Sequence, residues 1–143
     1  MARILILGAG GVANVIAVKI SQQPGTFSSL CIASRNPVKC SKIAARVETA
    51  LPVTTARIDA SDGASVADLI RKEGSSIVMN AALPEHNLPI MDACLEAGAH
   101  YIDTSAPEPV AGAYELFAYR WQLAYHERFQ KAGLTGLLSI GFD

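Results

Sequence analysis

Three small residues near the amino terminus have the spacing that a phosphate-binding turn requires. Gly8, Gly10 and Ala13 fit the pattern G-x-G-x-x-G/A, and Gly11 and Val12 lie between them. In this pattern the first glycine allows a tight turn, the second lets a pyrophosphate approach the backbone, and the third small residue lets the next helix pack closely. The N–H groups that begin such a helix bind phosphate oxygens. The spacing predicts a dinucleotide site, and the alternative is a strand-to-helix turn without a ligand.

A hydroxyl and a guanidinium follow the second apolar run of the sequence. Ser34 and Arg35 stand where a site for NAD usually carries an aspartate or glutamate. An acid there would bond the ribose 2′-hydroxyl and repel a 2′-phosphate, whereas a hydroxyl and a guanidinium suit that phosphate. The pair therefore favours NADP(H) over NAD(H) as the cofactor. A surface arginine beside a helix cap is the alternative.

Two later segments supply further candidates for cofactor contact. Asp59 follows the third apolar run, where it could contact the adenine amino group or hold a turn, and both interpretations stay open. Residues 80–84 (Asn-Ala-Ala-Leu-Pro) are small and then stiffened by proline, as a loop beside the nicotinamide ribose would be. The alternative is an ordinary turn with Asn87 as a helix cap. The candidate cofactor-binding residues are thus Gly8, Gly10, Gly11, Val12, Ser34, Arg35, Asp59, Ala81, Ala82 and Pro84.

Other reactive residue types form no recognisable catalytic or metal-binding pattern, so no catalytic residue is assigned. The three histidines lack metal-ligand spacing, and the segment 103–105 (Asp-Thr-Ser) could cap a helix or lie on the substrate side. Cys31, Cys40 and Cys94 match neither a disulfide framework nor a zinc site, so we expect ordinary thiols in or near the core. An aromatic stripe at helical spacing is typical of a core or a domain interface. Its members are Tyr114, Phe117, Trp121 and Tyr125.

The elements that must position these residues are short apolar runs alternating with amphipathic segments. We expect strands over residues 3–7, 30–33, 53–58, 77–79, 100–102 and 134–140. We expect helices over residues 12–22, 37–47, 88–97 and 113–131, and one that Asp62 caps and that ends near Gly74. This alternation predicts the α/β class, with a doubly wound parallel sheet of about six strands, the Rossmann NAD(P)-binding fold. Ligands of such sheets bind beyond the carboxyl ends of the strands, where the candidate residues lie.

Composition agrees with a cofactor-binding domain and excludes several other classes. The 143 residues suffice for one domain, and a chain that is 50% hydrophobic and 17% charged suits a sheet buried on both faces. The formal net charge of -1 gives no reason to expect a nucleic acid or an anionic membrane as partner. The sequence shows neither a membrane-spanning run nor a signal-peptide pattern. Because the three cysteines match no disulfide framework, we expect a reducing cytoplasm as the location.

The sequence resembles the saccharopine dehydrogenase-like family along essentially its whole length. The segment 121–128 (Trp-Gln-Leu-Ala-Tyr-His-Glu-Arg) is similar to the branch of that family that forms carboxynorspermidine in polyamine biosynthesis, whereas the Rossmann segments are generic. Ala13 and Asn14 replace the more usual glycine-containing start of the first helix. The other segments that carry the resemblance are 6–12, 33–35, 88–98, 100–104, 131–135 and 141–143.

The resemblance implies an NADPH-dependent reduction of an imine. The small-molecule substrates would be L-aspartate β-semialdehyde and a diamine, either 1,3-diaminopropane or putrescine, and the full-length enzyme would be a homodimer. A lysine-pathway oxidoreductase of the saccharopine dehydrogenase type is one alternative, and a non-catalytic nucleotide-sensing module is another. In the family, Gly-Phe-Asp is followed by Pro-Gly and a large domain. We therefore expect an NAD(P)-binding domain over residues 1–143 with a substrate and dimerisation domain after it, and weak NADPH binding without turnover from this part alone.

Overall fold

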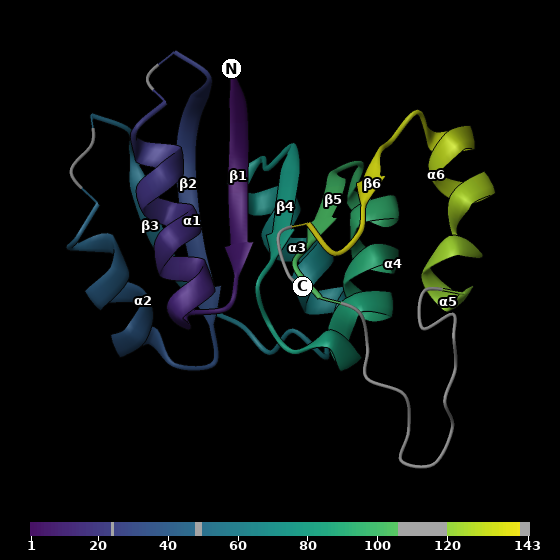
Figure 1. Cartoon of the computed structure of the whole chain (residues 1–143), viewed down its shortest axis with the longest axis horizontal. Coiled ribbons are helices and arrows are strands. Elements are labelled where there is room, and N and C mark those ends of the chain that lie inside the picture. The colour runs from purple at the N-terminus through teal and green to yellow at the C-terminus, as the bar shows by residue number, and fades with distance from the viewer. Residues whose placement is uncertain (24, 48–49, 106–119, 141–143) are drawn as a thin grey trace.

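A parallel sheet of six strands forms the centre of the computed structural model, which describes residues 1–23, 25–47, 50–105 and 120–140. The strand order is β3-β2-β1-β4-β5-β6, and every neighbouring pair is parallel (Figure 1). The order reverses between β1 and β4, which is the switch point of a doubly wound sheet. The predicted fold class is confirmed. The strands are β1 (Ala2–Leu7), β2 (Phe27–Ser34), β3 (Val53–Arg57), β4 (Ile77–Asn80), β5 (His100–Asp103) and β6 (Gly136–Leu137).

Helices cover both faces of this sheet, and alternate residues of β1 show why. Ile4 and Ile6 pack in the cluster that α1 and α2 cover, whereas Leu5 and Leu7 pack in the cluster under α3 and α4 (Figure 1). A strand buried on both faces needs a continuous apolar run, and β1 has one. The helices are α1 (Gly11–Ser21), α2 (Pro37–Ala44), α3 (Gly63–Glu73), the 3-10 turn η1 (Pro84–His86), α4 (Asn87–Ala97), α5 (Arg120–Leu123) and α6 (His126–Ala132).

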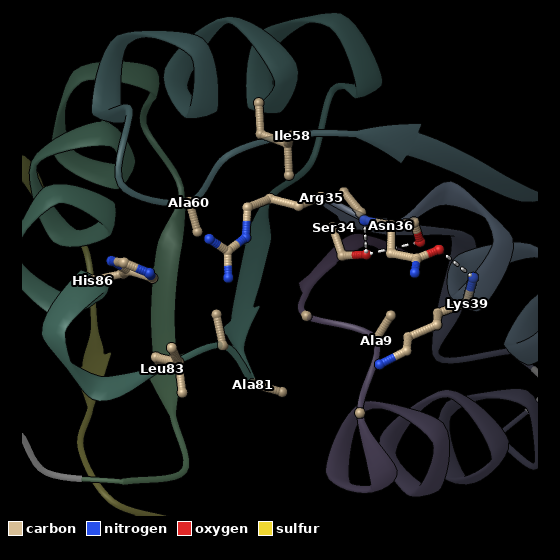
Figure 2. A pocket seen from close by; sticks show the side chains of 14 residues that line it. Ala9, Ser34, Arg35, Asn36, Lys39, Ile58, Ala60, Ala81, Leu83 and His86 are labelled. Carbon is tan, nitrogen blue, oxygen red and sulfur yellow. Dashed lines mark hydrogen bonds between the residues drawn. The ribbon is translucent and has the colours of Figure 1, made fainter.

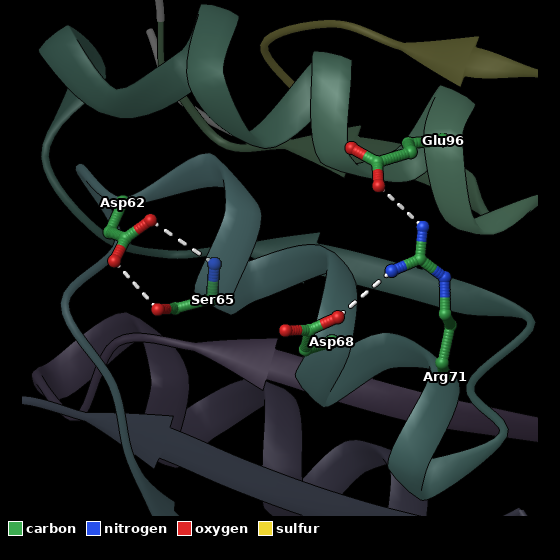
Figure 3. A network of polar contacts seen from close by, with 5 residues as sticks. All are labelled: Asp62, Ser65, Asp68, Arg71 and Glu96. Carbon is green, nitrogen blue, oxygen red and sulfur yellow. Dashed lines mark hydrogen bonds and ion pairs between the residues drawn. The ribbon is translucent and has the colours of Figure 1, made fainter.

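Local capping signals begin α2, and begin and end α3, where the sequence predicts. The Asn36 side chain accepts a hydrogen bond from the backbone N–H of Lys39 at 3.2 Å. Asp62 likewise accepts from the Ser65 N–H at 3.1 Å and from the Ser65 hydroxyl at 2.6 Å, and these bonds hold the pKa of Asp62 below its ordinary value (Figure 3). At the other end of α3, Gly74 has the left-handed conformation, with φ of 62°. The bonds from the Lys39 and Ser65 N–H groups satisfy backbone donors that the start of a helix leaves free, and the Gly74 N–H satisfies carbonyls at the end of α3.

Charged side chains join α3 to α4 on the outside of the domain. The Arg71 guanidinium contacts the carboxylates of Asp68 at 2.9 Å and Glu96 at 2.5 Å (Figure 3). The three side chains are between 45% and 80% exposed, so water and salt screen the interaction. The packing of the two helices therefore depends chiefly on the apolar residues beneath them, including Val66, Ile70 and Ile90.

The three cysteines are buried free thiols, as expected. Burial raises the pKa of Cys31 to about 11 and that of Cys94 to about 12. Since the thiolate is the reactive form of cysteine, these side chains act as small apolar core residues.

The carboxyl-terminal elements differ from the prediction. In place of one helix over 113–131, the described residues form two short helices, because the Tyr125 N–H bonds the Gln122 carbonyl three residues back and tightens the chain there. Residues 113–119 lie outside the described residues. The predicted strand 134–140 is reduced to β6, because the Thr135 N–H donates to the His100 ring and Ser139 turns out of the extended conformation, with φ of 50°.

Candidate cofactor site

A cavity of about 390 Å³ opens beyond the carboxyl ends of β1, β2 and β4, at the switch point of the sheet. It brings together six of the ten candidate residues, which come from the end of β2 and from the segments that follow the three strands. Those six are Gly8, Gly10, Ser34, Arg35, Ala81 and Ala82. The cavity is also lined by Ala9, Ala33, Asn36, Lys39, Ile58, Ala60, Leu83 and His86.

Gly8 makes the turn from β1 toward α1, and no other residue type fits there. Its φ is +115°, and a Cβ on it would lie 2.5 Å from the carbonyl oxygen of Ala81. Two backbone bonds of 2.8 Å, from the Gly8 N–H to Ala33 and from the Ala81 N–H to Leu7, hold the three segments together. The loop after β4 therefore lies directly against the glycine turn.

Neither a steric clash nor a positive φ requires glycine at positions 10 and 11, in contrast to Gly8. A Cβ on either would meet nothing within 4 Å, and Gly10 has φ of -92° and ψ of -167°, which any residue adopts. The missing side chains instead leave open space at the start of α1, where backbone N–H groups point outward. Ala13 of α1 is fully buried in the core cluster that this helix covers, as the spacing predicted, whereas Val12 is 37% exposed and is not among the residues that line the cavity.

Two cations from the β2–α2 segment extend toward the cavity. Figure 2 shows the Arg35 guanidinium pointing into it and the Lys39 ammonium directed toward the glycine turn near Ala9. The Ser34 hydroxyl beside them is engaged in its own turn, since it donates to the Asn36 carbonyl and accepts from the Asn36 N–H, both at 3.1 Å. The prediction missed Lys39. The available signal was its place in the first turn of the helix that follows β2.

Asp59 lies at the edge of this region and holds a turn. Its Oδ1 accepts from the N–H of Ser61 at 3.0 Å and from the Ser61 hydroxyl at 2.7 Å, and these bonds lower the pKa of Asp59. Its neighbours Ile58 and Ala60 line the cavity, but Asp59 does not. The turn-holding interpretation is therefore confirmed, while a contact with adenine stays a prediction.

The loop after β4 is fixed by side chains that point inward. Asn80 accepts a hydrogen bond from the Ala82 N–H at 3.0 Å, which places Ala81 and Ala82 in the cavity wall. Pro84 begins η1 and lines no part of the cavity, although Leu83 and His86 on either side of it do. The alternative of Asn87 as a helix cap is wrong, because Asn87 is the first residue of α4. Its buried side-chain oxygen accepts a hydrogen bond from the Asn80 NH₂ group instead.

The remaining candidates lie away from the cavity. Trp121 is 56% exposed, with the Arg120 guanidinium 4.5 Å from its ring, so it is not a core residue. Tyr114 and Phe117 of the same stripe lie outside the described residues. Asp103, by contrast, is buried among hydrogen-bond donors. The residues that the structure describes contain no group of three or more metal-ligating side chains, and none of their helices is long and apolar enough to cross a membrane.

A parallel sheet of this order, with a glycine turn at its switch point, is the architecture of dinucleotide-binding α/β domains. Comparison with protein families makes the class specific. The model of the saccharopine dehydrogenase NADP binding domain matches residues 4–137, and the chain belongs to that family. The family resemblance inferred from the sequence is confirmed.

Curated relatives match the whole chain but extend well beyond it. Carboxyaminopropylagmatine dehydrogenase of Synechocystis sp. is 43% identical over 143 residues, which is 100% of this chain and 35% of that protein. Carboxynorspermidine synthase of Vibrio alginolyticus is 36% identical over 149 residues, covering 98% of this chain and 36% of the relative. The chain thus spans about a third of the length of these relatives.

Solved structures with the same fold are more distant in sequence. Saccharopine dehydrogenase (L-Glu forming) of Saccharomyces cerevisiae superposes with a TM-score of 0.76 at 16% identity, over 99% of this chain and 27% of that one. Scyllo-inositol dehydrogenase of Lactobacillus casei, solved with NAD(H) and scyllo-inositol, gives a TM-score of 0.69 at 14% identity, over 96% of this chain and 36% of the other. At these identities the likeness shows the fold alone.

Proposed function

We propose that the chain binds NADP(H) in preference to NAD(H). The pyrophosphate lies at the start of α1, over Gly10 and Gly11, and Arg35 and Lys39 bind the 2′-phosphate of the adenosine ribose. One observation carries the preference: among the residues that the structure describes, those that line the cavity include Arg35, Lys39 and His86 but no aspartate or glutamate. A cavity lined in this way attracts a phosphate group and lacks the carboxylate that would select a free 2′-hydroxyl.

Titration with both cofactors, combined with charge removal, tests the preference. Arg35→Ala is expected to weaken NADPH binding by roughly tenfold or more, the cost of one charge-assisted contact, and to leave NADH binding unchanged. Lys39→Ala is expected to act in the same direction. Lys42→Ala is the matched control, because it removes the same charge from the same helix without touching the cavity. Equal affinities for the two cofactors, unaffected by Arg35→Ala, would contradict the proposal.

We further propose that the chain is the cofactor-binding part of a longer protein, and that this protein reduces an imine formed from an amino-acid semialdehyde, L-aspartate β-semialdehyde, and an amine. The cofactor supplies the hydride, and the domain's part is to hold the nicotinamide in place and exclude water. The names of the two curated relatives support this, since each describes an amine carrying a carboxylated aminopropyl group. The amines differ, however. The candidates are therefore the diamines 1,3-diaminopropane and putrescine, and agmatine.

Cofactor oxidation by the full-length protein tests this activity. NADPH absorbance is expected to fall only when the semialdehyde and one of the three amines are both present, because neither substrate alone contains the reducible C=N bond. Each amine is supplied in turn, and the product mass identifies the carboxylated amine. Saccharopine formation from lysine and a keto acid, without turnover of the semialdehyde, would favour the lysine-pathway alternative.

A further inference from the structure

Five polar side chains form a buried network beside the cofactor cavity. They come from β4, α4, β5 and α5, and each is at most 2% exposed. Polar groups withdrawn from water in this way are costly unless their hydrogen bonds are made within the protein. The network consists of Asn80, Asn87, Tyr101, Asp103 and Gln122.

Asp103 sets the direction of the hydrogen bonds, because three donors converge on its carboxylate. Oδ2 accepts from the Tyr101 hydroxyl at 2.9 Å and from the Gln122 amide at 2.6 Å, and Oδ1 accepts from the Ser139 N–H at 2.5 Å. A carboxylate only accepts, so the amide of Gln122 must turn its NH₂ group inward. This orientation leaves Gln122 Oε1 buried without a hydrogen-bond partner among the described residues.

The same constraint passes through Tyr101 to the cavity wall. Because the Tyr101 hydroxyl gives its hydrogen to Asp103, its oxygen accepts from the Asn80 NH₂ group at 3.3 Å. The Asn80 NH₂ group also donates to the Asn87 side chain at 2.7 Å. The carbonyl oxygen of the Asn80 amide therefore points the other way, where it accepts from the Ala82 N–H at 3.0 Å.

Asp103 also fixes the segment that follows β6. Its backbone carbonyl accepts from the Ile140 N–H at 2.9 Å, in addition to the bond from Ser139 to its side chain. Between these two bonds Ser139 has φ of 50°, in the left-handed region that residues other than glycine seldom occupy. The backbone there takes a conformation that the two bonds to Asp103 impose.

We propose that Asp103 is a positioning residue for the cofactor site. Through Tyr101 and Asn80 it fixes Ala82 in the wall of the cavity, and through Ser139 and Ile140 it joins the segment after β6 to the same wall. The claim that fixing Ala82 positions the cofactor rests on the proposed cofactor function. The hydrogen-bond path itself can be measured without any cofactor.

Two variants test the path at different points, each compared with the wild type in the 143-residue chain. Tyr101→Phe removes only the hydroxyl that links Asp103 to Asn80. Asp103→Asn keeps the size of the side chain but places an NH₂ group against donors. Both are expected to shift the Ala82 amide resonance and speed its hydrogen exchange in the ligand-free protein, and to weaken NADPH binding by roughly tenfold.

Ile20→Ala is the control for a general loss of stability. Ile20 is 5% exposed and packs in the core cluster on the other face of the sheet, at the end of α1 farther from the glycine turn. Ile20→Ala is expected to lower the free energy of unfolding without shifting the Ala82 amide resonance or changing the affinity for NADPH. If the Asp103→Asn variant does not fold, the result for Tyr101→Phe alone decides whether the proposed path exists.

The outcomes separate this proposal from the cofactor assignment. If the resonance and the hydrogen exchange of the Ala82 amide are unchanged in both variants, the proposed path from Asp103 to the cavity is wrong. If the Ala82 amide resonance shifts but the affinity for NADPH is unchanged, Asp103 is not a positioning residue for the cofactor site. A wild-type chain that binds no NADPH refutes the proposed function instead, and the Ala82 amide still shows whether the path exists.

Discussion

Gly8→Ala is expected to abolish cofactor binding and to lower the free energy of unfolding by about 3 kcal/mol or more. A non-glycine residue at a positive φ costs about 1–3 kcal/mol, and overpacking adds about as much. Both penalties apply here, because φ is +115° and the new Cβ would lie 2.5 Å from the Ala81 carbonyl oxygen. The clash is with backbone, so no side-chain rotation relieves it. Relief requires the β4 loop to move away from the glycine turn and open the cavity.

Chemical denaturation and NADPH titration measure the two parts of this effect, and Gly11→Ala is the matched control for the stability measurement. Gly11 lies in the same loop, begins α1 and has nothing within 4 Å of its added Cβ. Alanine is the better helix former, so Gly11→Ala is expected to leave stability unchanged or raise it by up to about 1 kcal/mol. Equal stabilities for the two variants would show that the turn relaxes freely, which contradicts the role assigned to Gly8.

Gly10→Asp is expected to weaken NADPH binding by roughly a hundredfold or more while the fold remains as stable as before. Gly10 is the N-cap of α1, and aspartate is among the residues that cap best. A Cβ added at Gly10 has no described neighbour within 4 Å. The aspartate side chain does, however, place a negative charge where the pyrophosphate is proposed to lie, and two like charges about 4 Å apart repel by about 4 kcal/mol near a protein surface.

Gly10→Asn separates charge from size in this experiment. Asparagine caps a helix as well as aspartate does and has nearly the same shape, but it carries no charge. We expect it to weaken binding less than Gly10→Asp, and we expect only the aspartate variant to recover affinity as salt is added. Unchanged NADPH affinity in both variants would place the pyrophosphate elsewhere than the start of α1.

Features that depend on a few neighbouring residues were predictable from the sequence. The apolar run of β1, the glycine turn and the caps at Asn36 and Asp62 each form through local contacts, and the structure has all of them. The elements after β5 were not predictable in the same way. The end of β6 and the turn at Ser139 depend on bonds to Asp103, which lies 36 residues earlier in the sequence.

The residues of the candidate site likewise fall into those that could be predicted from their place in the sequence and those that could not. Residues that directly follow a strand, such as Arg35 and Ala81, reach the cavity as the rule for parallel sheets predicts. Lys39 and His86 reach it from helical turns, whose rotation about the helix axis the sequence does not reveal. Asn80 was read as part of a loop, but its side chain belongs to a network assembled from four separate elements.

The close approach of Gly8 to the Ala81 carbonyl also bears on how such a domain can evolve or be redesigned. That half of the site is backbone against backbone, so almost any substitution at Gly8 costs the fold as well as the function. Arg35 and Lys39, in contrast, are exposed side chains outside the two core clusters. On the proposed assignment, selection or protein engineering could therefore change cofactor preference at little cost to the fold, whereas the glycine turn proposed to hold the pyrophosphate could not be changed without a loss of stability.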